Sequence, residues 1–275
     1  MPTLLALVVV ASAIGFTVRY SSYVPWGTDA AAYIEAAHRW ADADVFSPAS
    51  FVFWAPWAEA GRLEAPLGFT PGPAAGTFVS MYPLGYPVLL AAALKFGGPL
   101  APYVVAPLFA GLLAWCAYLL ASQLSGPWGG LMASVLIAAS PVTLANAMSP
   151  MSDVPAAALW ALSWVLSLRP GIGAILASGL ATALAIMVRP NLAPLAGVIA
   201  IVATASTPRS SGRWARLATF LATAALGPAI VLWSQAVLYG DPLSAGYGSF
   251  GAFFSADRIL PNLALYPRLF VDMHG

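Results

Sequence analysis

The sequence predicts an all-α polytopic membrane protein with about seven transmembrane helices. Hydrophobic residues make up 60% of the 275 residues and charged residues only 8%, shares well outside those of soluble domains. Apolar runs near the length of a membrane span recur along the chain, with Gly, Pro, Ser and Arg at the joints between them. The net charge of +1 argues against nucleic acid as a partner, because binding to a phosphate backbone requires a clustered basic surface.

The predicted spans follow one another in a single membrane domain, residues 1–275. They are residues 3–18, 101–122, 128–147, 154–168, 171–188, 190–205 and 217–239. A span needs about 20 residues, so the shorter runs must extend into flanking residues. The first run contains Ala11-Ser-Ala13, which resembles a signal-peptidase site, but it lacks a basic n-region. An uncleaved span is therefore favoured over a cleaved signal peptide.

Residues 19–100 are predicted to form the first extracytoplasmic loop, and residues 240–275 another. The first loop ends in an apolar stretch, Met81 to Gly98, which is interrupted by Pro83 and Pro87. Its uninterrupted part, residues 88–94, gives only about 10 Å of helix against roughly 30 Å of hydrocarbon. The stretch is therefore predicted to lie along the membrane surface.

The distribution of arginines supports this topology. If the stretch does not cross, an inside N-terminus leaves Arg169 and the group Arg209, Arg213 and Arg216 in short cytoplasmic loops, with Arg189 in a short outer loop. The same assignment places all 10 acidic residues outside. Two explanations stay open: a site built from outer loops, or long outer loops that carry most charges of both signs.

The residues after the first span predict an amphipathic helix at the interface. Thr28 can cap its N-terminus and places Asp29 in the first turn, where a carboxylate is favoured. One face carries Ala32, Tyr33, Ala36, Ala37 and Trp40, and the other carries Glu35, His38, Arg39 and Asp42. Glu35 and Arg39 are expected to pair on the surface. Asp29 is either a helix-start charge without a chemical role or a catalytic acid.

Further motifs occur in order along the chain. They are Asp29 with Tyr33, Tyr82-Pro-Leu-Gly-Tyr-Pro87, Ser140-Pro-Val-Thr143, Ser149-Pro-Met-Ser-Asp-Val-Pro155, Val188-Arg-Pro-Asn191 and Tyr239-Gly-Asp-Pro-Leu-Ser244. With this set the chain resembles the GT-C superfamily of polyprenyl-phosphate-sugar-dependent glycosyltransferases. It is most similar to the family 39 branch, which includes protein O-mannosyltransferases and the aminoarabinose transferase of lipid A.

The resemblance implies roles for individual residues. Asp29 matches the position of the family's general base, although Thr28 and Ala30 flank it where several members have a paired acid. Cations must stabilise the departing lipid phosphate, and the candidates are Arg189, with Arg258 and Arg268 as partners. Candidate substrate contacts are Tyr33, Tyr82, Tyr86, Asp153 and Tyr247; the family often has Glu where this chain has Asp153.

Each candidate also has a purely structural interpretation. Arg189 is equally an interfacial anchor or a helix-end cation. Asp153 is expected to cap a helix or to contact an acceptor, and Tyr82, Tyr86 and Tyr247 are typical of an aromatic belt. The glycine-rich residues 246–251 lack the phosphate-loop spacing and are predicted to form a flexible outer loop.

The predicted function is that of an inverting glycosyltransferase in a bacterial cytoplasmic membrane, with its active site facing outside. The implied partners are a polyprenyl-phosphate-linked sugar, a lipid, glycan or protein acceptor, and membrane lipids, with no nucleic acid. No metal ligands are assigned, and a divalent metal remains open. A transporter and a non-catalytic assembly subunit are the alternatives; the spans lack internal acids, which argues against a translocation path. The chain is also expected to be truncated relative to the family.

Overall fold

The computed structural model describes residues 1–25, 27–42, 52–54, 68–72, 77–205, 212–249, 251 and 255–274. Arg209 and the acidic residues Asp44, Glu59 and Glu64, which the topology prediction uses, lie outside these ranges. The described residues are mostly helical, as predicted. They also include two small antiparallel sheets that the all-α prediction does not contain.

Three helical segments in the described ranges are long and apolar enough to cross a membrane. They are α1 (Pro2–Tyr20), α4 (Pro102–Ala139) and Gly212–Tyr239, which comprises α9 (Gly212–Ala224) and α10 (Leu226–Tyr239). The remaining predicted spans also contain helices, but shorter ones: α5 (Pro141–Ala147), α6 (Asp153–Ser167), α7 (Ile172–Val188) and α8 (Leu195–Ala205).

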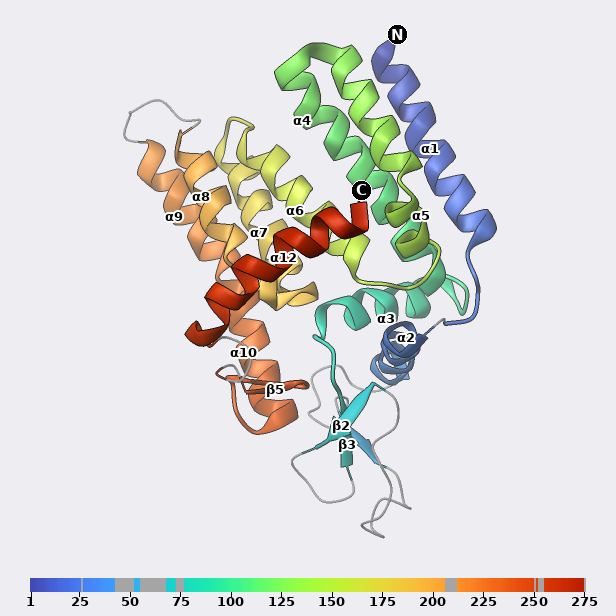
Figure 1. The fold of residues 1–275 in the computed structure, drawn as a ribbon, viewed down its shortest axis with the longest axis vertical. Coiled ribbons are helices and arrows are strands. Elements are labelled where there is room, and N and C mark those ends of the chain that lie inside the picture. The colour runs from blue at the N-terminus through green and yellow to red at the C-terminus, as the bar shows by residue number, and fades with distance from the viewer. Residues whose placement is uncertain are drawn as a thin grey trace.

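Helix α4 consists of two antiparallel halves. Ser125 and Gly126 have non-helical backbone angles, and Gly126 has a φ of 75° that favours glycine. Beyond this turn Gly130 packs against the backbone of Tyr118, so the chain has reversed direction (Figure 1). The turn falls between the predicted spans 101–122 and 128–147, as the Ser-Gly-Pro sequence indicates.

Contacts inside the bundle are close and partly polar. Helix α1 packs against α4, where Gly111 lies against Ile14. Between α6 and α7, the Ser163 hydroxyl lies 2.7 Å from the Thr182 hydroxyl and 3.1 Å from that of Ser178. Such small polar residues let neighbouring helices approach and hydrogen-bond in apolar surroundings.

Two short helices, α2 (Gly27–Asp42) and α3 (Gly85–Gly97), lie across one end of the bundle (Figure 1). Helix α3 has 13 residues, which is about 20 Å of helix and too short to cross a bilayer. Helix α2 buries the predicted face, including Tyr33 and Trp40, and pairs Glu35 with Arg39. This face packs against α3, however, so protein covers much of the surface that was predicted to meet lipid.

The sheets flank this end of the molecule. Strands β1 (Val52–Trp54), β2 (Phe69–Pro71) and β3 (Thr77–Ser80) form a sheet in the order β1-β3-β2, with Val79 of β3 opposite Val52 and Thr70. Strands β4 (Ser244–Ala245) and β5 (Gly248–Ser249) form a hairpin, and β5 lies within residues 246–251, which were predicted as a flexible loop. Strands this short leave no long alternating pattern for a sequence to display.

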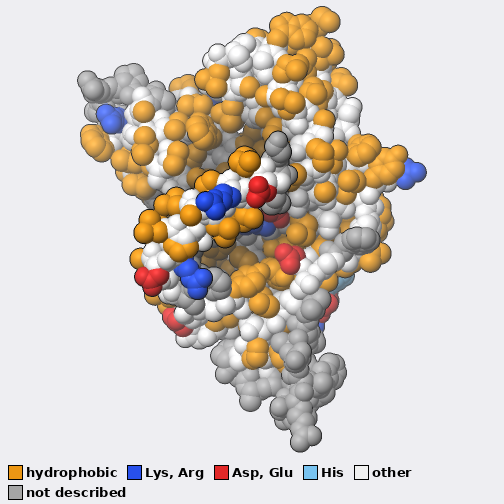
Figure 2. All heavy atoms as spheres, viewed as in Figure 1, with side chains coloured by type: hydrophobic (Ala, Val, Ile, Leu, Met, Phe, Trp, Pro, Cys, Tyr) orange, Lys and Arg blue, Asp and Glu red, His pale blue; other side chains and the backbone are white. Residues whose placement is uncertain are grey.

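The surface separates apolar from charged regions. On the face in Figure 2, hydrophobic side chains cover the parts formed by α1, α4 and α9, and the visible acidic side chains lie in the middle and lower part. Helix α12 (Ile259–His274) runs obliquely across the front in Figure 1 after the short helix η4 (Ala256–Arg258). The visible carboxylates therefore lie away from the apolar part formed by α1, α4 and α9.

Candidate functional site

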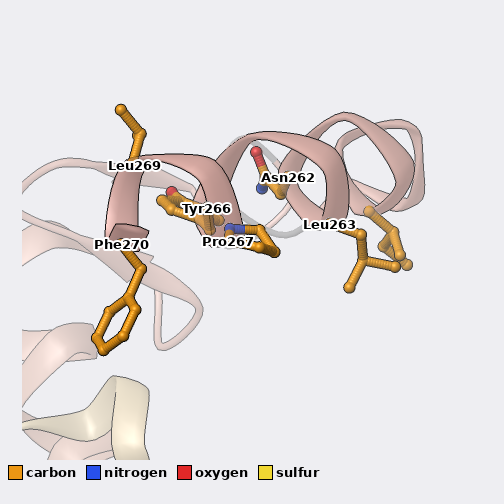
Figure 3. A pocket seen from close by; sticks show the side chains of 7 residues that line it. Asn262, Leu263, Tyr266, Pro267, Leu269 and Phe270 are labelled. Carbon is orange, nitrogen blue, oxygen red and sulfur yellow. The ribbon is translucent and has the colours of Figure 1, made fainter. Parts of the chain in front are cut away.

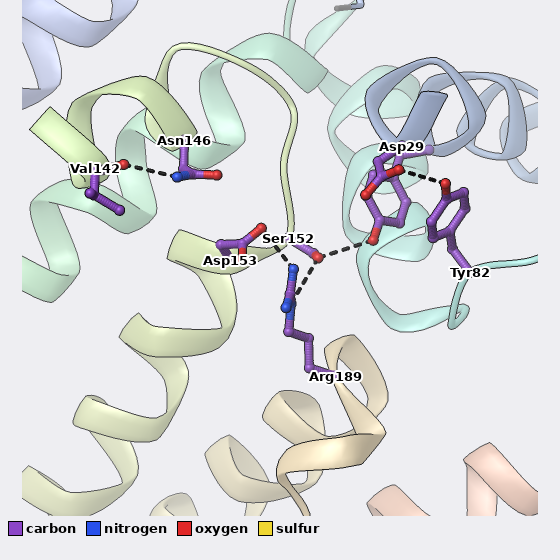
Figure 4. Close-up of polar contacts among 8 residues, drawn as sticks. Asp29, Tyr82, Val142, Asn146, Ser152, Asp153 and Arg189 are labelled. Atoms are coloured by element: carbon purple, nitrogen blue, oxygen red, sulfur yellow. Dashed lines mark hydrogen bonds and ion pairs between the residues drawn. The ribbon is translucent and has the colours of Figure 1, made fainter. Parts of the chain in front are cut away.

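The first half of the candidate site is Asp29, in the first turn of α2. The Tyr82 hydroxyl donates a hydrogen bond of 2.6 Å to Asp29 Oδ1 (Figure 4). Tyr82 lies just after β3 and before α3, so the turn between sheet and helix brings it to the start of α2. The carboxylate is thus held by a phenol 53 residues away in sequence.

The second half is Arg189, at the C-terminal end of α7. Its Nη2 lies 2.7 Å from Asp153 Oδ2 at the start of α6. Its Nε donates to the Ser152 hydroxyl at 3.2 Å. The Tyr33 hydroxyl lies 3.0 Å from the same Ser152 oxygen, so α2, α6 and α7 meet at one buried serine (Figure 4).

Aromatic rings join the two halves. The Tyr33 ring centroid lies 4.9 Å from that of Tyr82 and 5.1 Å from that of Tyr86, and Tyr247 meets Tyr82 edge-on at 6.0 Å. We call the whole group the Asp29–Arg189 cluster. Its members are Asp29, Tyr33, Tyr82, Tyr86, Ser152, Asp153, Arg189 and Tyr247.

Burial distinguishes the roles of these tyrosines. Tyr33, Tyr82 and Tyr86 are buried, with Tyr86 fully so, whereas Tyr247 is 54% exposed. Rings buried in protein do not form an interfacial belt, so that interpretation is wrong for Tyr82 and Tyr86. Tyr86 presents no surface to a substrate, and among the described residues its buried hydroxyl has no hydrogen-bond partner. Tyr247 is the tyrosine of the cluster that is open to a ligand.

The phenols of the cluster stay protonated at ordinary pH. Burial is the main cause that raises the pKa of Tyr33, to about 12. Burial and the hydrogen bond to Asp29 raise the pKa of Tyr82 further above its ordinary range. Burial also raises the pKa of Tyr247, and the charge of Asp29 adds to this effect. Each phenol therefore keeps its proton and remains available as a hydrogen-bond donor.

Two prolines shape the Arg189 side of the cluster. Arg189 precedes Pro190 and has an extended backbone, with φ −141° and ψ 89°, as expected for a residue before proline. Helix α7 therefore ends there. Ser152 precedes α6 as its N-cap residue but makes no side-chain capping hydrogen bond. Pro155 occupies the third helical position and has no N–H to offer, which removes one of the usual capping partners.

Two close approaches bring the elements together. A Cβ on Gly85 would lie 2.4–2.6 Å from the backbone of Met187 and Val188, so the start of α3 fits against the last turn of α7 only as glycine. A Cβ on Gly246 would lie 2.3 Å from Met81 Cα, so the β4–β5 hairpin reaches the residue before Tyr82. The Tyr239 hydroxyl also donates to the carbonyl of Ser80 at 2.8 Å.

The cluster combines two carboxylates, of Asp29 and Asp153, with one guanidinium, of Arg189. Asp153 forms an ion pair with Arg189, and the sequence did not indicate this pairing. In the described ranges no group of three or more His, Cys, Asp or Glu side chains is placed to hold a metal ion. A carboxylate can accept a proton, and a guanidinium can bind an anion, so acid–base chemistry beside a phosphate is the chemistry these groups offer.

Arg258 and Arg268 lie elsewhere. Arg258 ends η4 and Arg268 lies on α12; both are exposed. Within the described residues neither has a hydrogen bond or ion pair to the cluster. An open groove of about 770 Å³ lies along α12 (Figure 3). It is lined by Ile259, Asn262, Leu263, Tyr266, Pro267, Leu269 and Phe270. This groove includes no predicted site residue.

Sequence reasoning missed Ser152 as a member of the site. The signal in the sequence was Pro155. Proline has no N–H, so a serine three residues earlier cannot accept a capping hydrogen bond from it, and its hydroxyl can bind another group. Comparisons of the chain with models of known protein families, with curated proteins and with solved structures gave no match.

Proposed function

We propose that this chain is a membrane glycosyltransferase of the GT-C type that transfers a sugar from a polyprenyl-phosphate donor to a hydroxyl acceptor. The proposal places the site at the extracytoplasmic face of a bacterial cytoplasmic membrane, in a protein of about seven spans. The observation that carries it is the junction of Asp29 with Arg189. A carboxylate and a guanidinium from distant segments join one cluster at the end of an apolar helical bundle.

The position of the cluster suits a lipid-linked donor. Such a donor keeps its chain in the bilayer, so its sugar and phosphate stay near headgroup height. Helices α2 and α3 lie across the end of the bundle, where a membrane surface would pass (Figure 1). Asp29 and Arg189 would then meet the donor without either charge entering the hydrocarbon, which would be costly.

The proposed reaction is a single displacement. Asp29 accepts the proton of the acceptor hydroxyl while its oxygen forms a bond to the anomeric carbon of the sugar. The bond between that carbon and the phosphate oxygen breaks, and the electron pair leaves with the lipid phosphate. Arg189 stabilises the negative charge on that phosphate. Attack opposite the leaving group inverts the anomeric carbon, and Tyr82 keeps Asp29 in place.

Asp29→Asn tests the role of the carboxylate. Asparagine keeps the size and the acceptor oxygen for Tyr82 but cannot take a proton, so transfer should fall by about 100-fold or more. Membranes containing the protein would be incubated with candidate polyprenyl-phosphate sugars, and donor loss would be followed.

The matched control is Asp42→Asn, at the exposed end of the same helix, which should leave transfer unchanged. Both variants must reach wild-type levels in the membrane. Full activity of Asp29→Asn would remove Asp29 from the mechanism. A second arm uses Arg189→Ala, which should weaken use of the donor.

A further inference from the structure

We infer that Ser152 is a positioning residue, which fixes the guanidinium of Arg189 for the donor phosphate and connects it to the helix that carries Asp29. The inference rests on the proposed function. Ser152 is 1% exposed, so it acts through Arg189 rather than by touching a substrate. Its hydroxyl is shared by Arg189 Nε and Tyr33 Oη, at 3.2 and 3.0 Å.

The local sequence leaves the Ser152 hydroxyl without its usual role in capping the helix. A serine before a helix usually adopts an extended backbone and accepts a hydrogen bond from the second or third helical N–H. Ser152 instead has φ −81° and ψ −9°, and the third helical residue is Pro155. Its carbonyl still accepts from Ala156 N at 3.0 Å. The backbone therefore starts α6 without the side chain, which is left to bind Arg189.

Ser152 and Asp153 hold two different nitrogens of the guanidinium. An arginine can only donate, so the Ser152 oxygen accepts from Nε, while the Asp153 carboxylate accepts from Nη2. In the described part of the chain Nη1 has no hydrogen-bond partner. The Arg189 side chain is 33% exposed. One edge of the planar group is thus fixed to the first turn of α6, and the remaining N–H groups are open to an anion.

Fixing this side chain matters because a free arginine side chain has many rotamers. Ordering one costs conformational entropy, which must otherwise be supplied when the ligand binds. Contacts to Nε and Nη2 in the free protein order the side chain beforehand. A phosphate then meets a guanidinium whose orientation is already set, which strengthens binding without a further contact.

Tyr33 extends the connection to α2. It lies one helical turn after Asp29, and its hydroxyl meets the Ser152 oxygen in a buried position. The serine therefore contacts residues from both halves of the cluster. Losing the hydroxyl of Ser152 removes partners from Arg189 and Tyr33 together, whereas losing that of Tyr33 leaves the contact between Ser152 and Arg189 intact.

The experiment measures binding of a polyprenyl monophosphate to the detergent-purified full chain, together with the donor KM and kcat in membranes. Ser152→Ala should weaken lipid-phosphate binding and raise the donor KM by about tenfold, the value of one hydrogen bond to a charged group. Because Ser152 acts only through Arg189, which also stabilises the leaving phosphate, kcat should fall severalfold, far less than in Asp29→Asn. Tyr33→Phe should weaken binding less, by about threefold.

The matched control is Ser163→Ala on the same helix. Ser163 is also buried and also hydrogen-bonded to neighbouring side chains, but it lies between α6 and α7 away from the cluster. It should leave the affinity for lipid phosphate within twofold of wild type. If Ser152→Ala does not accumulate, Ser152→Cys replaces it, since a thiol keeps the size and is a weaker acceptor.

The two levels of the proposal fail in different ways. Wild-type binding by Ser152→Ala or its replacement, alongside weakened binding by Arg189→Ala, would overturn the role of Ser152 and leave the proposed function standing. An Arg189→Ala protein that binds lipid phosphate like wild type would instead remove Arg189 from donor binding, and the Ser152 proposal with it. Equal weakening by Ser152→Ala and Ser163→Ala would indicate a general packing effect and also overturn the role.

Discussion

An arginine side chain lies at each end of helix α7: Arg216, which comes from α9, lies near its start, and Arg189 lies at its end. The two guanidinium groups have different kinds of hydrogen-bond partner. At the start of α7, Arg216 donates to the carbonyls of Ser167, Arg169 and Gly171 at 2.9, 3.1 and 3.2 Å. At its end, Arg189 is bound by the side chains of Ser152 and Asp153. Arg216 is 9% exposed, whereas the Arg189 side chain is 33% exposed.

This difference indicates which of the two guanidinium groups is available to bind an anionic ligand. The partners of Arg216 are the carbonyl of the last residue of α6, where the helix dipole favours a cation, and two carbonyls of the loop that follows. No carboxylate pairs with Arg216 among the described residues. Arg189 has partners that are themselves side chains, one of them 41% exposed. A guanidinium held this way can exchange or add an anionic partner, whereas one held by carbonyls serves the fold.

The largest effect is expected at the Arg216 end. Arg216→Ala removes three hydrogen bonds to buried or partly buried carbonyls and should lower the stability of the folded protein by about 3 kcal/mol. Thermal unfolding in detergent would measure it. Arg213→Ala is the control, because Arg213 lies on the same helix over the Trp214 ring and should cost less than about 1 kcal/mol. Equal melting temperatures for the two variants would contradict a structural role of Arg216.

The Arg189 end should respond more strongly to alkaline pH. The folded-state pKa of Tyr33 is raised to about 12 from an ordinary value of 10.0. Its contribution to stability is therefore fully present below pH 10 and is lost as the pH rises towards 12. This loss should amount to roughly 2 kcal/mol, and the carbonyls around Arg216 do not titrate.

Thermal unfolding between pH 8 and pH 12 would measure this loss. The stability of Tyr33→Phe should fall less steeply above pH 10 than that of wild type. The remaining fall comes from the other tyrosines with a raised pKa, including Tyr82, Tyr86, Tyr239 and Tyr247. Identical pH dependence in the two proteins would show that Tyr33 titrates as an exposed tyrosine does.

The smallest effect has the opposite sign. Asp153→Asn keeps an oxygen that can accept from Arg189 but removes the negative charge that repels a phosphate. Binding of a polyprenyl monophosphate should become about fivefold tighter, which is about 1 kcal/mol. Asp42→Asn is again the control and should bind as wild type does. Weaker binding by Asp153→Asn would mean that the charge of Asp153 is needed to hold Arg189.

Much of the fold could be predicted from local patterns. The turn in α4 follows from Ser125-Gly-Pro127, and the buried face of α2 follows from its apolar spacing. The small strands were missed because three or four residues give no period to detect. The prediction that lipid covers the apolar face of α2 was also wrong, because this face packs against α3. Amphipathic spacing shows that a face is buried but not whether lipid or protein covers it.

The sequence by itself determined the apolar helices, the shortness of α3 and the chemical types of the candidate residues, because each depends on composition and spacing along a few turns. Only the tertiary structure decided which candidates meet. It brought Arg189 to Asp153 and Ser152, it buried Tyr86, and it left Arg258 and Arg268 outside the cluster. Those outcomes depend on close packing between segments far apart in sequence, such as Gly85 against Met187. A local sequence pattern does not predict such long-range contacts.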